Sequence, residues 1–292
     1  MAAAQGFASQ LGWAASGTAD TRFEFISESL RKTGSFHYSN GIQGSREYDG
    51  GRVVAGVNRV AGTIVMQPNP VELDALLPFI LGADESTDVF DLADALQLRD
   101  IAIDRVTKVF TYAYCVCARA VFSVTSGGPL QLSMDIIGRT ESVGNAGTFP
   151  SLSIGVLTGP YMMHNNTTAT VGGSSITFRD LEITIDNMVD DSRYLNSQNI
   201  VSSVAQDRNI TIALTAPYGD SSSFYSLSSA GVASVFTFTN AGASITFTFG
   251  KIHYPVESPI VEGKSEIWLP LSGRACKTGS TPSLRVTNDS TL

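Results

Sequence analysis

Two stretches of this chain have the alternation of a β-strand with one buried face, and each stops at the dipeptide Gly-Arg. The first follows the strand-like run Val121–Val124 and a Gly-Gly-Pro turn, and its apolar positions are Leu130, Leu132, Met134 and Ile136 before Gly138-Arg139. The second has Ile267, Leu269 and Leu271 before Gly273-Arg274. Apolar residues at every second position are typical of a strand packed on one side. The two stretches lie close to half the chain length apart, which indicates an internal repeat.

Two further landmarks occur in the same order in both halves. Gly44-Ser45-Arg46-Glu47-Tyr48 resembles Asp191–Tyr194, and the strand-like run 58–66 resembles 207–214, with a proline shortly after each. Ordered landmarks whose spacing drifts through loops favour a duplicated domain. The alternative is that two unrelated antiparallel β domains have a similar succession of strands and turns.

Length and composition agree with two globular units. At roughly 150 residues per domain, 292 residues suggest about two domains. Hydrophobic residues make up 43% of the chain and charged residues 16%, enough for real cores. Abundant Gly, Ser and Thr with few helical patterns predict an all-β fold class, a β-sandwich or partial barrel with a flanking helix, present in duplicate. We expect an N-terminal arm over 1–20, domains over 21–155 and 156–279 joined by a connector over 141–160, and a loose polar tail over 280–292.

One helix is predicted strongly, over Asn69–Gly82. Asn69 can cap it, Pro70 suits the first position, Glu72 suits the first turn and Gly82 suits the end. Pro78 inside it predicts a kink or an early stop. A weaker helix is expected at the equivalent place in the second half, after Asp220.

Strands are expected over short and long runs on both sides of one polar loop. The loop is Asn40–Arg52, too rich in glycine and polar residues for a strand, and loops of this length inside compact domains are usually functional. The expected strands are 23–26, 34–38, 53–66, 106–124, 176–185, 209–216 and the hairpin 235–249.

The sequence offers no catalytic constellation and no cofactor site. His37, His164 and His253 have no metal-ligand partners at suitable spacing, and the acidic run over 84–94 lacks the spacing of a calcium loop. The odd count of cysteines, Cys115, Cys117 and Cys276, predicts free thiols. A net charge of −8 argues against a nucleic-acid-binding surface, and no apolar run reaches the roughly 18 residues of a membrane span. We therefore expect neither an enzyme nor a metal or cofactor site.

The order of strand, long polar loop, strand, proline-started helix and Gly-turn hairpin resembles the tail tube proteins of long-tailed bacteriophages. The segments Val57–Gly62, Asn69–Pro78 and Arg193–Gln198 carry the resemblance most closely. It implies a duplicated tube fold, each unit a small β-sandwich with one flanking helix. It also implies self-assembly: domains join side by side around a channel, the long loop reaches the adjacent ring, and rings stack into a tube.

With two fused domains, this resemblance implies three copies in a pseudo-sixfold ring. We expect the inter-ring contacts in the loop Asn40–Arg52 and in its counterpart, the region Asp190–Gln206, at Gly44, Ser45, Arg46, Glu47, Tyr48, Asp49, Arg193, Tyr194 and Asn196. The implied partners are further copies and other tail proteins at the tube ends, while DNA passes the lumen without specific binding and no membrane is involved. The implied location is the virion tail, after assembly in the host cytoplasm. The alternative is a β-rich virion or surface binding module, such as a fibre or adhesin-like domain.

Overall fold

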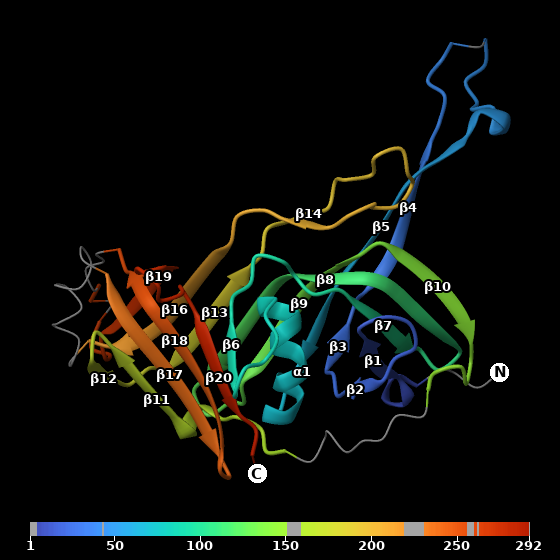
Figure 1. Ribbon diagram of the computed structural model, residues 1–292. Helices are drawn as coiled ribbons and strands as arrows, with labels where there is room; N and C mark the ends of the chain where they lie inside the picture. The colour runs from blue at the N-terminus through green and yellow to red at the C-terminus, as the bar shows by residue number, and fades with distance from the viewer. Residues whose placement is uncertain are drawn as a thin grey trace.

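The chain is mostly strand, with one α-helix among the residues that the structure describes (Figure 1). The structure is a computed structural model and describes residues 5–42, 44–150, 159–218, 231–255, 260–261 and 263–291. The elements are β1 (Gln10–Ala14), β2 (Thr21–Phe23), β3 (Ser27–Glu28), β4 (Arg31–His37), β5 (Val54–Met66), α1 (Pro70–Leu81), β6 (Val89–Asp91), β7 (Arg99–Asp104), β8 (Lys108–Thr125), β9 (Gln131–Gly138), β10 (Thr140–Asn145), β11 (Thr167–Val171), β12 (Ser174–Ile176), β13 (Asp180–Asp186), β14 (Val189–Asp190), β15 (Val204–Ala205), β16 (Asn209–Pro217), β17 (Val232–Asn240), β18 (Ala243–His253), β19 (Trp268–Cys276) and β20 (Arg285–Asp289). The predicted all-β class is confirmed.

Strand β8 is the longest strand described and belongs to two layers. Its first part pairs with β7 and β10, and its second part pairs with β9 and β13. The hairpin predicted around the Gly-Gly-Pro turn is confirmed, with Phe122 opposite Leu132. At the turn, Gly127 has a φ of 76°, a conformation that glycine adopts without strain.

The same set of antiparallel pairings occurs twice, in the same order along the chain. Over residues 5–150 (the first half) the pairs are β1–β2, β1–β7, β4–β5, β5–β9, β7–β8, β8–β9 and β8–β10. Over residues 159–291 (the second half) they are β11–β12, β11–β17, β13–β16, β16–β19, β17–β18, β18–β19 and β18–β20. Each strand of the first set therefore has a counterpart in the second.

The two halves are joined into one sheet. Residues 119–125 of β8 pair with β13, with Arg119 opposite Asp186, so that β5, β9, β8, β13, β16 and β19 run edge to edge. A second link comes from β6 of the first half, which pairs with β20 of the second. The hydrophobic core is also shared, because Phe122 and Phe247 meet with ring centroids 5.0 Å apart.

Helix α1 begins and ends as its sequence predicts. Asn69 and Glu72 form a reciprocal capping box, which satisfies two amides at the helix start, and Gly82 ends the helix with a φ of 96°. The expected early stop at Pro78 is wrong, because the helix continues to Leu81. Its leucines, Phe79 and Ile80 are fully buried in the shared core. This burial stabilises the last turn of the helix although Pro78 has no N–H to donate.

Two buried asparagines of the second half bind the two ends of α1. The side-chain amide of Asn288 donates to the carbonyl of Pro70 at 2.7 Å, and that of Asn187 donates to the carbonyl of Ile80 at 3.1 Å. The helix is therefore a first-half element that the second half holds in place.

The expected loose termini are wrong over most of their described length. Within the expected arm, β1 pairs with β7, and Trp13 is buried against Phe23 and Phe79. Within the expected tail, β20 pairs with β18 and β6, and Val286 is fully buried. Both strands are short and partly polar, so their own sequences do not predict them. They form because they pair with strands distant in the chain.

Two smaller expectations also change, and a third is not tested. The expected connector over 141–160 contains β10, which pairs with β8. The second Gly-Arg does not end its strand, since β19 continues to Cys276. The weaker helix expected after Asp220 lies outside the described residues. In contrast, the hairpin of β17 and β18 is confirmed, with positive φ at Ala241 and Gly242 in its turn.

The prediction that the cysteines are free thiols is confirmed. Cys115 and Cys117 are buried and Cys276 is half-buried, and none of them is paired. Burial raises the pKa of the Cys115 and Cys117 thiols well above the usual range, so both are poor nucleophiles.

Candidate functional site

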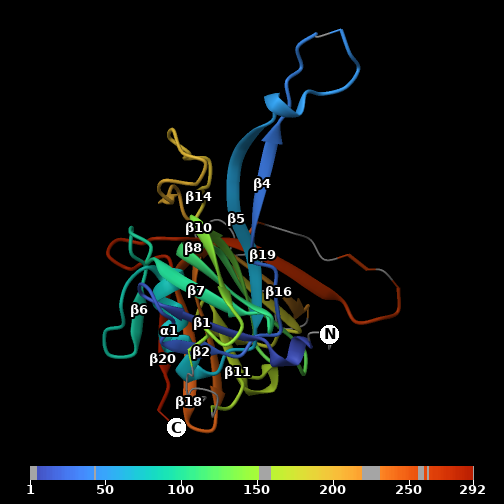
Figure 2. The same cartoon turned by 90° about the vertical axis from the view of Figure 1, so that its right-hand side faces the viewer.

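A long hairpin arm projects from the body of the molecule. It is formed by the outer ends of β4 and β5 and the loop between them, residues 36–42 and 44–54, and Figures 1 and 2 show it standing clear of every other element. All of β4 is exposed. The nominated residues Gly44, Ser45, Arg46, Glu47, Tyr48 and Asp49 lie together in this loop and are exposed. There Asp49 accepts a hydrogen bond from the Gly51 amide at 2.9 Å and shapes a short turn.

Large apolar side chains are exposed along the arm. The exposed fractions are 63% for Phe36, 54% for Tyr38, 104% for Ile42, 65% for Tyr48 and 63% for Val54. The Tyr38 and Tyr48 rings pack together with centroids 5.6 Å apart. Grouped exposed apolar side chains on a projection mark a protein–protein contact surface.

Sequence reasoning nominated the polar loop Asn40–Arg52 without naming Ile42 within it, and it missed Phe36 and Val54, which flank the loop. The available signal was the presence of large apolar residues beside a glycine-rich loop. That signal could not show whether they are buried, because burial depends on what packs against a strand and not on its own sequence.

The second nominated region, over 190–206, lies against the base of the arm. The Asn58 amide donates to the carbonyl of Gln198 at 2.6 Å, and the Asn58 side chain donates to Asn199 at 3.2 Å. Arg59 and Asp191 form an ion pair of 2.6 Å at the surface. The structure therefore brings the second nominated region to the base of the arm that carries the first.

The nominated residues of this second region have different surroundings. Asn196 is exposed with a φ of 63°. Tyr194 packs on a small core cluster with Val116, Ile137 and Ile200, so part of its role is structural. Arg193 is half-buried, and its Nε has no hydrogen-bond partner.

The joined sheet has one face in the core and one polar face, here called the polar sheet face. In β13, Leu181, Ile183 and Ile185 are buried, so the alternate residues lie on the other face. Two shallow hollows lie along this face. The side chains of the polar sheet face are mostly small or charged and include Thr63, Arg119, Ser123, Thr125, Asp135, Asp180, Glu182, Asp186, Thr211, Ala213, Thr215, Ser272 and Arg274.

Acidic groups of the polar sheet face concentrate on β13. Asp180, Glu182 and Asp186 come from this one strand, and Asp135 of β9 accepts a hydrogen bond from Thr63 at 2.6 Å. Asp186 lies opposite Arg119 in the register, whereas Asp180 and Glu182 lie opposite Thr125 and Ser123. At that end of β13, Asp180 forms an ion pair with Arg179 at 2.7 Å, so Glu182 is the carboxylate there with no cation opposite it in the register.

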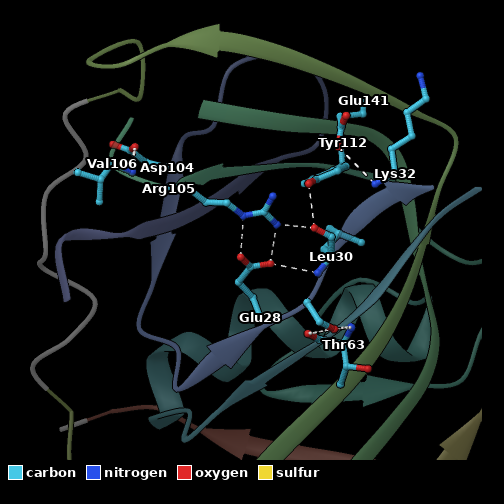
Figure 3. A network of polar contacts seen from close by, with 10 residues as sticks. Glu28, Leu30, Lys32, Thr63, Asp104, Arg105, Val106, Tyr112 and Glu141 are labelled. Atoms are coloured by element: carbon cyan, nitrogen blue, oxygen red, sulfur yellow. Dashed lines mark hydrogen bonds and ion pairs between the residues drawn. The ribbon is translucent and has the colours of Figure 1, made fainter. Parts of the chain in front are cut away.

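A polar network covers the outer edge of β3 and β4 (Figure 3). Glu28 forms an ion pair with Arg105 at 2.8 Å, and the Tyr112 hydroxyl donates to the Leu30 carbonyl at 2.8 Å. The Lys32 amide donates to the Glu141 carboxylate at 3.3 Å. Burial raises the pKa of Tyr112 to about 12, so the phenol remains a donor at neutral pH. The network ties this edge to β8 and β10 through side chains and not through backbone pairing.

The described residues show no feature of a metal site or a membrane span. No group of three or more His, Cys, Asp and Glu residues among them could hold a metal ion. In the acidic run, Asp91 binds Arg285 and Asp84 accepts from Gln97. None of the described helices is long and apolar enough to cross a bilayer.

Comparison with known proteins identifies the family. Residues 4–275 match the family model described as "Phage tail tube protein". A search of curated proteins gave no match. Because the family model covers most of the chain, the chain belongs to the phage tail tube proteins, which are structural proteins of the virion tail.

Proposed function

We propose that this protein assembles from two fused tube domains into rings that stack as the tail tube. The repeated pairing pattern supports the duplication, because each strand from β1 to β10, apart from β3 and β6, has a counterpart between β11 and β20. The strands paired in this way run over 10–145 and 167–289, so the first proposed domain begins before residue 21 and the second ends after residue 279, the limits expected from sequence. Three such chains form one pseudo-sixfold ring.

The observation that carries self-assembly is the hairpin arm. An isolated soluble protein gains nothing from Phe36, Ile42 and Val54 exposed on a projecting hairpin, since burying a large apolar side chain stabilises a contact by about 1.5–3 kcal/mol. A contact that repeats head to tail without closing builds a filament. The arm therefore reaches the adjacent ring, and the region over 190–206 at its base completes the contact.

The polar sheet face lines the channel. It lies opposite the core, it is built largely from small and hydroxyl side chains, and it carries Asp135, Asp180, Glu182 and Asp186. Carboxylates repel DNA phosphates, so DNA passes such a wall without binding tightly. The tube assembles in the host cytoplasm and then delivers DNA from the virion.

Negative-stain microscopy of the purified chain tests the assembly directly. We expect rings or hollow tubes from the intact protein. Deleting Gly44–Gly50 should leave a folded, soluble protein that forms no tubes, because the deletion shortens the arm.

Two outcomes contradict this function. Normal tubes from the deletion variant would remove the arm from the inter-ring contact. Isolated particles of the intact protein at every concentration, with affinity for a discrete ligand, would favour a fibre or adhesin-like binding module.

A further inference from the structure

The loop of the hairpin arm contains the single Asn-Gly dipeptide of the sequence, Asn40-Gly41. Both residues are exposed and lie outside every described helix and strand, in the projecting loop (Figure 2). The backbone nitrogen that follows an asparagine can close a five-membered ring with the side-chain carbonyl carbon. Glycine in the second position has no Cβ to hinder that closure. Asn40 and Gly41 are therefore able to react with each other.

The nucleophile of such a reaction, the Gly41 nitrogen, is held only loosely. Its N–H donates to the Ser39 hydroxyl at 3.4 Å, a long contact and the only hydrogen bond that the described residues offer to it. By contrast, the Asn145 side chain accepts from Lys108 at 2.9 Å, and Asn187 is buried among its partners. Both of these asparagines also precede a residue with a Cβ. Only the asparagine of the arm combines exposure, an unhindered neighbour and a loosely held amide.

Arg52 brings a positive charge to Gly41 from across the loop. Its Nη1 lies 3.9 Å from the point that a Cβ on Gly41 would occupy. A nearby cation favours the anionic form of an ionisable group, and here that form is the deprotonated amide, which is the nucleophile. Arg46 and Glu47, of opposite charge, line the same shallow hollow as Gly41. The turn that Asp49 shapes ends at Arg52 and places this cation beside the reacting nitrogen.

We propose that Asn40 is a self-modification site, at which the chain converts its own asparagine to aspartate and isoaspartate. Solvent hydroxide takes the proton of the Gly41 amide, and the nitrogen lone pair forms a bond to the Asn40 Cγ. The Cγ–Nδ2 bond breaks, and Nδ2 leaves as ammonia after taking a proton from water. The product is a five-membered succinimide. Water then adds to one of its two carbonyl carbons and breaks that carbon–nitrogen bond, so that only water is consumed and nothing is oxidised or reduced.

The modification changes the contact surface of the arm. Each conversion adds one negative charge close to the fully exposed Ile42 and to Tyr38, whose ring packs on Tyr48 with centroids 5.6 Å apart. Isoaspartate also lengthens the backbone by one carbon atom. Burying a new carboxylate in an apolar contact costs free energy. This consequence rests on the proposed inter-ring role of the arm: converted copies no longer join a tube, and docked arms convert more slowly.

Timed peptide mass spectrometry tests the site on the full-length, unassembled protein. Samples incubated in mildly alkaline buffer should show amide-to-acid conversion at Asn40 and release ammonia, and isoaspartate-specific enzymatic methylation should label the same peptide. Gly41→Ala should slow conversion by about tenfold or more, because alanine restricts the backbone and crowds the nitrogen. A Cβ there makes only ordinary contacts, 3.5 Å from the Ser39 hydroxyl, so the variant keeps the arm.

A matched pair of arginine variants tests the cation. Arg52→Gln should slow conversion by about two- to fivefold, the scale of a surface charge effect. Arg31→Gln, on β4 opposite Ala61 and away from the loop, is the control and should convert at the normal rate. Absence of conversion at Asn40, or an unchanged rate in Gly41→Ala, overturns the proposal. An unchanged rate in Arg52→Gln overturns the role of that arginine.

Tube assembly of aged samples separates this inference from the tube function. Converted copies should be depleted in tubes and enriched in the unassembled fraction. If converted copies enter tubes equally, the consequence for the arm contact is wrong while the modification stands. If tubes form and Asn40 never converts, the tube function stands and the modification is wrong. If Asn40 converts and no tubes form from fresh protein, the tube function fails and the modification stands.

Discussion

The side-chain amide of Asn187 lies 3.1 Å from the carbonyl oxygen of Ile80, and so a residue of the second half caps the helix of the first. The same amide also donates to the Cys117 carbonyl at 3.0 Å, and Arg208 donates to the Asn187 side-chain oxygen at 3.0 Å. Asn187 is 1% exposed. One buried side chain therefore joins α1, β8 and the start of β16.

Replacing Asn187 by alanine should destabilise the chain by about 2–3 kcal/mol, because two carbonyls and the Arg208 guanidinium lose a buried partner. Chemical denaturation of the unassembled protein measures this. Asn145→Ala on the exposed end of β10 is the control and should change stability by less than about 0.5 kcal/mol. If both variants lower the free energy of unfolding by the same small amount, the hydrogen bonds of Asn187 contribute little to stability.

Leu284→Ala should cost about 2–5 kcal/mol, since Leu284 is fully buried beside β20 and cannot be replaced there without a cavity. Deleting residues 284–292 should prevent stable folding, whereas deleting only residues 291–292 should be tolerated. Thermal melting of the three variants checks this. A stable protein after deletion of residues 284–292 would show that this segment is a loose tail.

Ile42→Asp and Phe36→Ser should block tube formation while leaving the melting temperature of the unassembled chain unchanged. Both side chains are largely exposed, so their loss removes little intramolecular burial. Light scattering during assembly gives the readout. Val143→Asp, which changes an exposed residue of β10 away from the arm, is the control and should assemble normally. A matching loss with Val143→Asp would mean that charge in general, and not the arm, governs assembly.

Asp180→Lys with Glu182→Lys should make tubes that retain DNA at low salt and release it at high salt, because lysines in the lumen attract phosphates. Phage carrying the variant should eject DNA more slowly. Asp84→Lys with Glu85→Lys makes the same change of charge outside the polar sheet face. Ejection at the normal rate from the first variant would place these carboxylates outside the channel.

Glu72 should make stability depend on pH. Burial raises the pKa of its carboxyl, against the opposing effect of hydrogen bonds from the Asn69 and Glu24 amides. A raised folded-state pKa favours the protonated form, so this contribution to stability is complete below the unfolded pKa of about 4.3 and is lost as pH rises through the folded value.

Denaturation midpoints between about pH 4 and about pH 7 should therefore fall less in Glu72→Gln than in the unaltered protein. Glutamine keeps an acceptor for the capping box, so the helix start survives. Asp74, whose pKa burial also raises, remains in both proteins and accounts for the residual slope. Parallel profiles in the two proteins would contradict the role of Glu72.

The sequence predicts an element correctly where a few neighbouring residues are enough to specify it. The capping box of α1 needs only Asn69 and Glu72 at the right spacing, and the hairpin of β17 and β18 needs only alternation around a turn. The loop of the arm was recognised by composition. By contrast, the exposure of Phe36 and Ile42 and the partial burial of Tyr194 depend on neighbours distant in the chain.

The sequence by itself determined the β class, the capped helix, the free cysteines and the existence of a long polar loop, because periodicity and residue chemistry act over a few neighbouring positions. Only the tertiary structure decided that β1 and β20 are strands, that β8 joins β13, and that the carboxylates of β13 share one face with Asp135. Those features are pairings between segments far apart in the chain. Their free energy comes from burial and hydrogen bonds that no single segment contains.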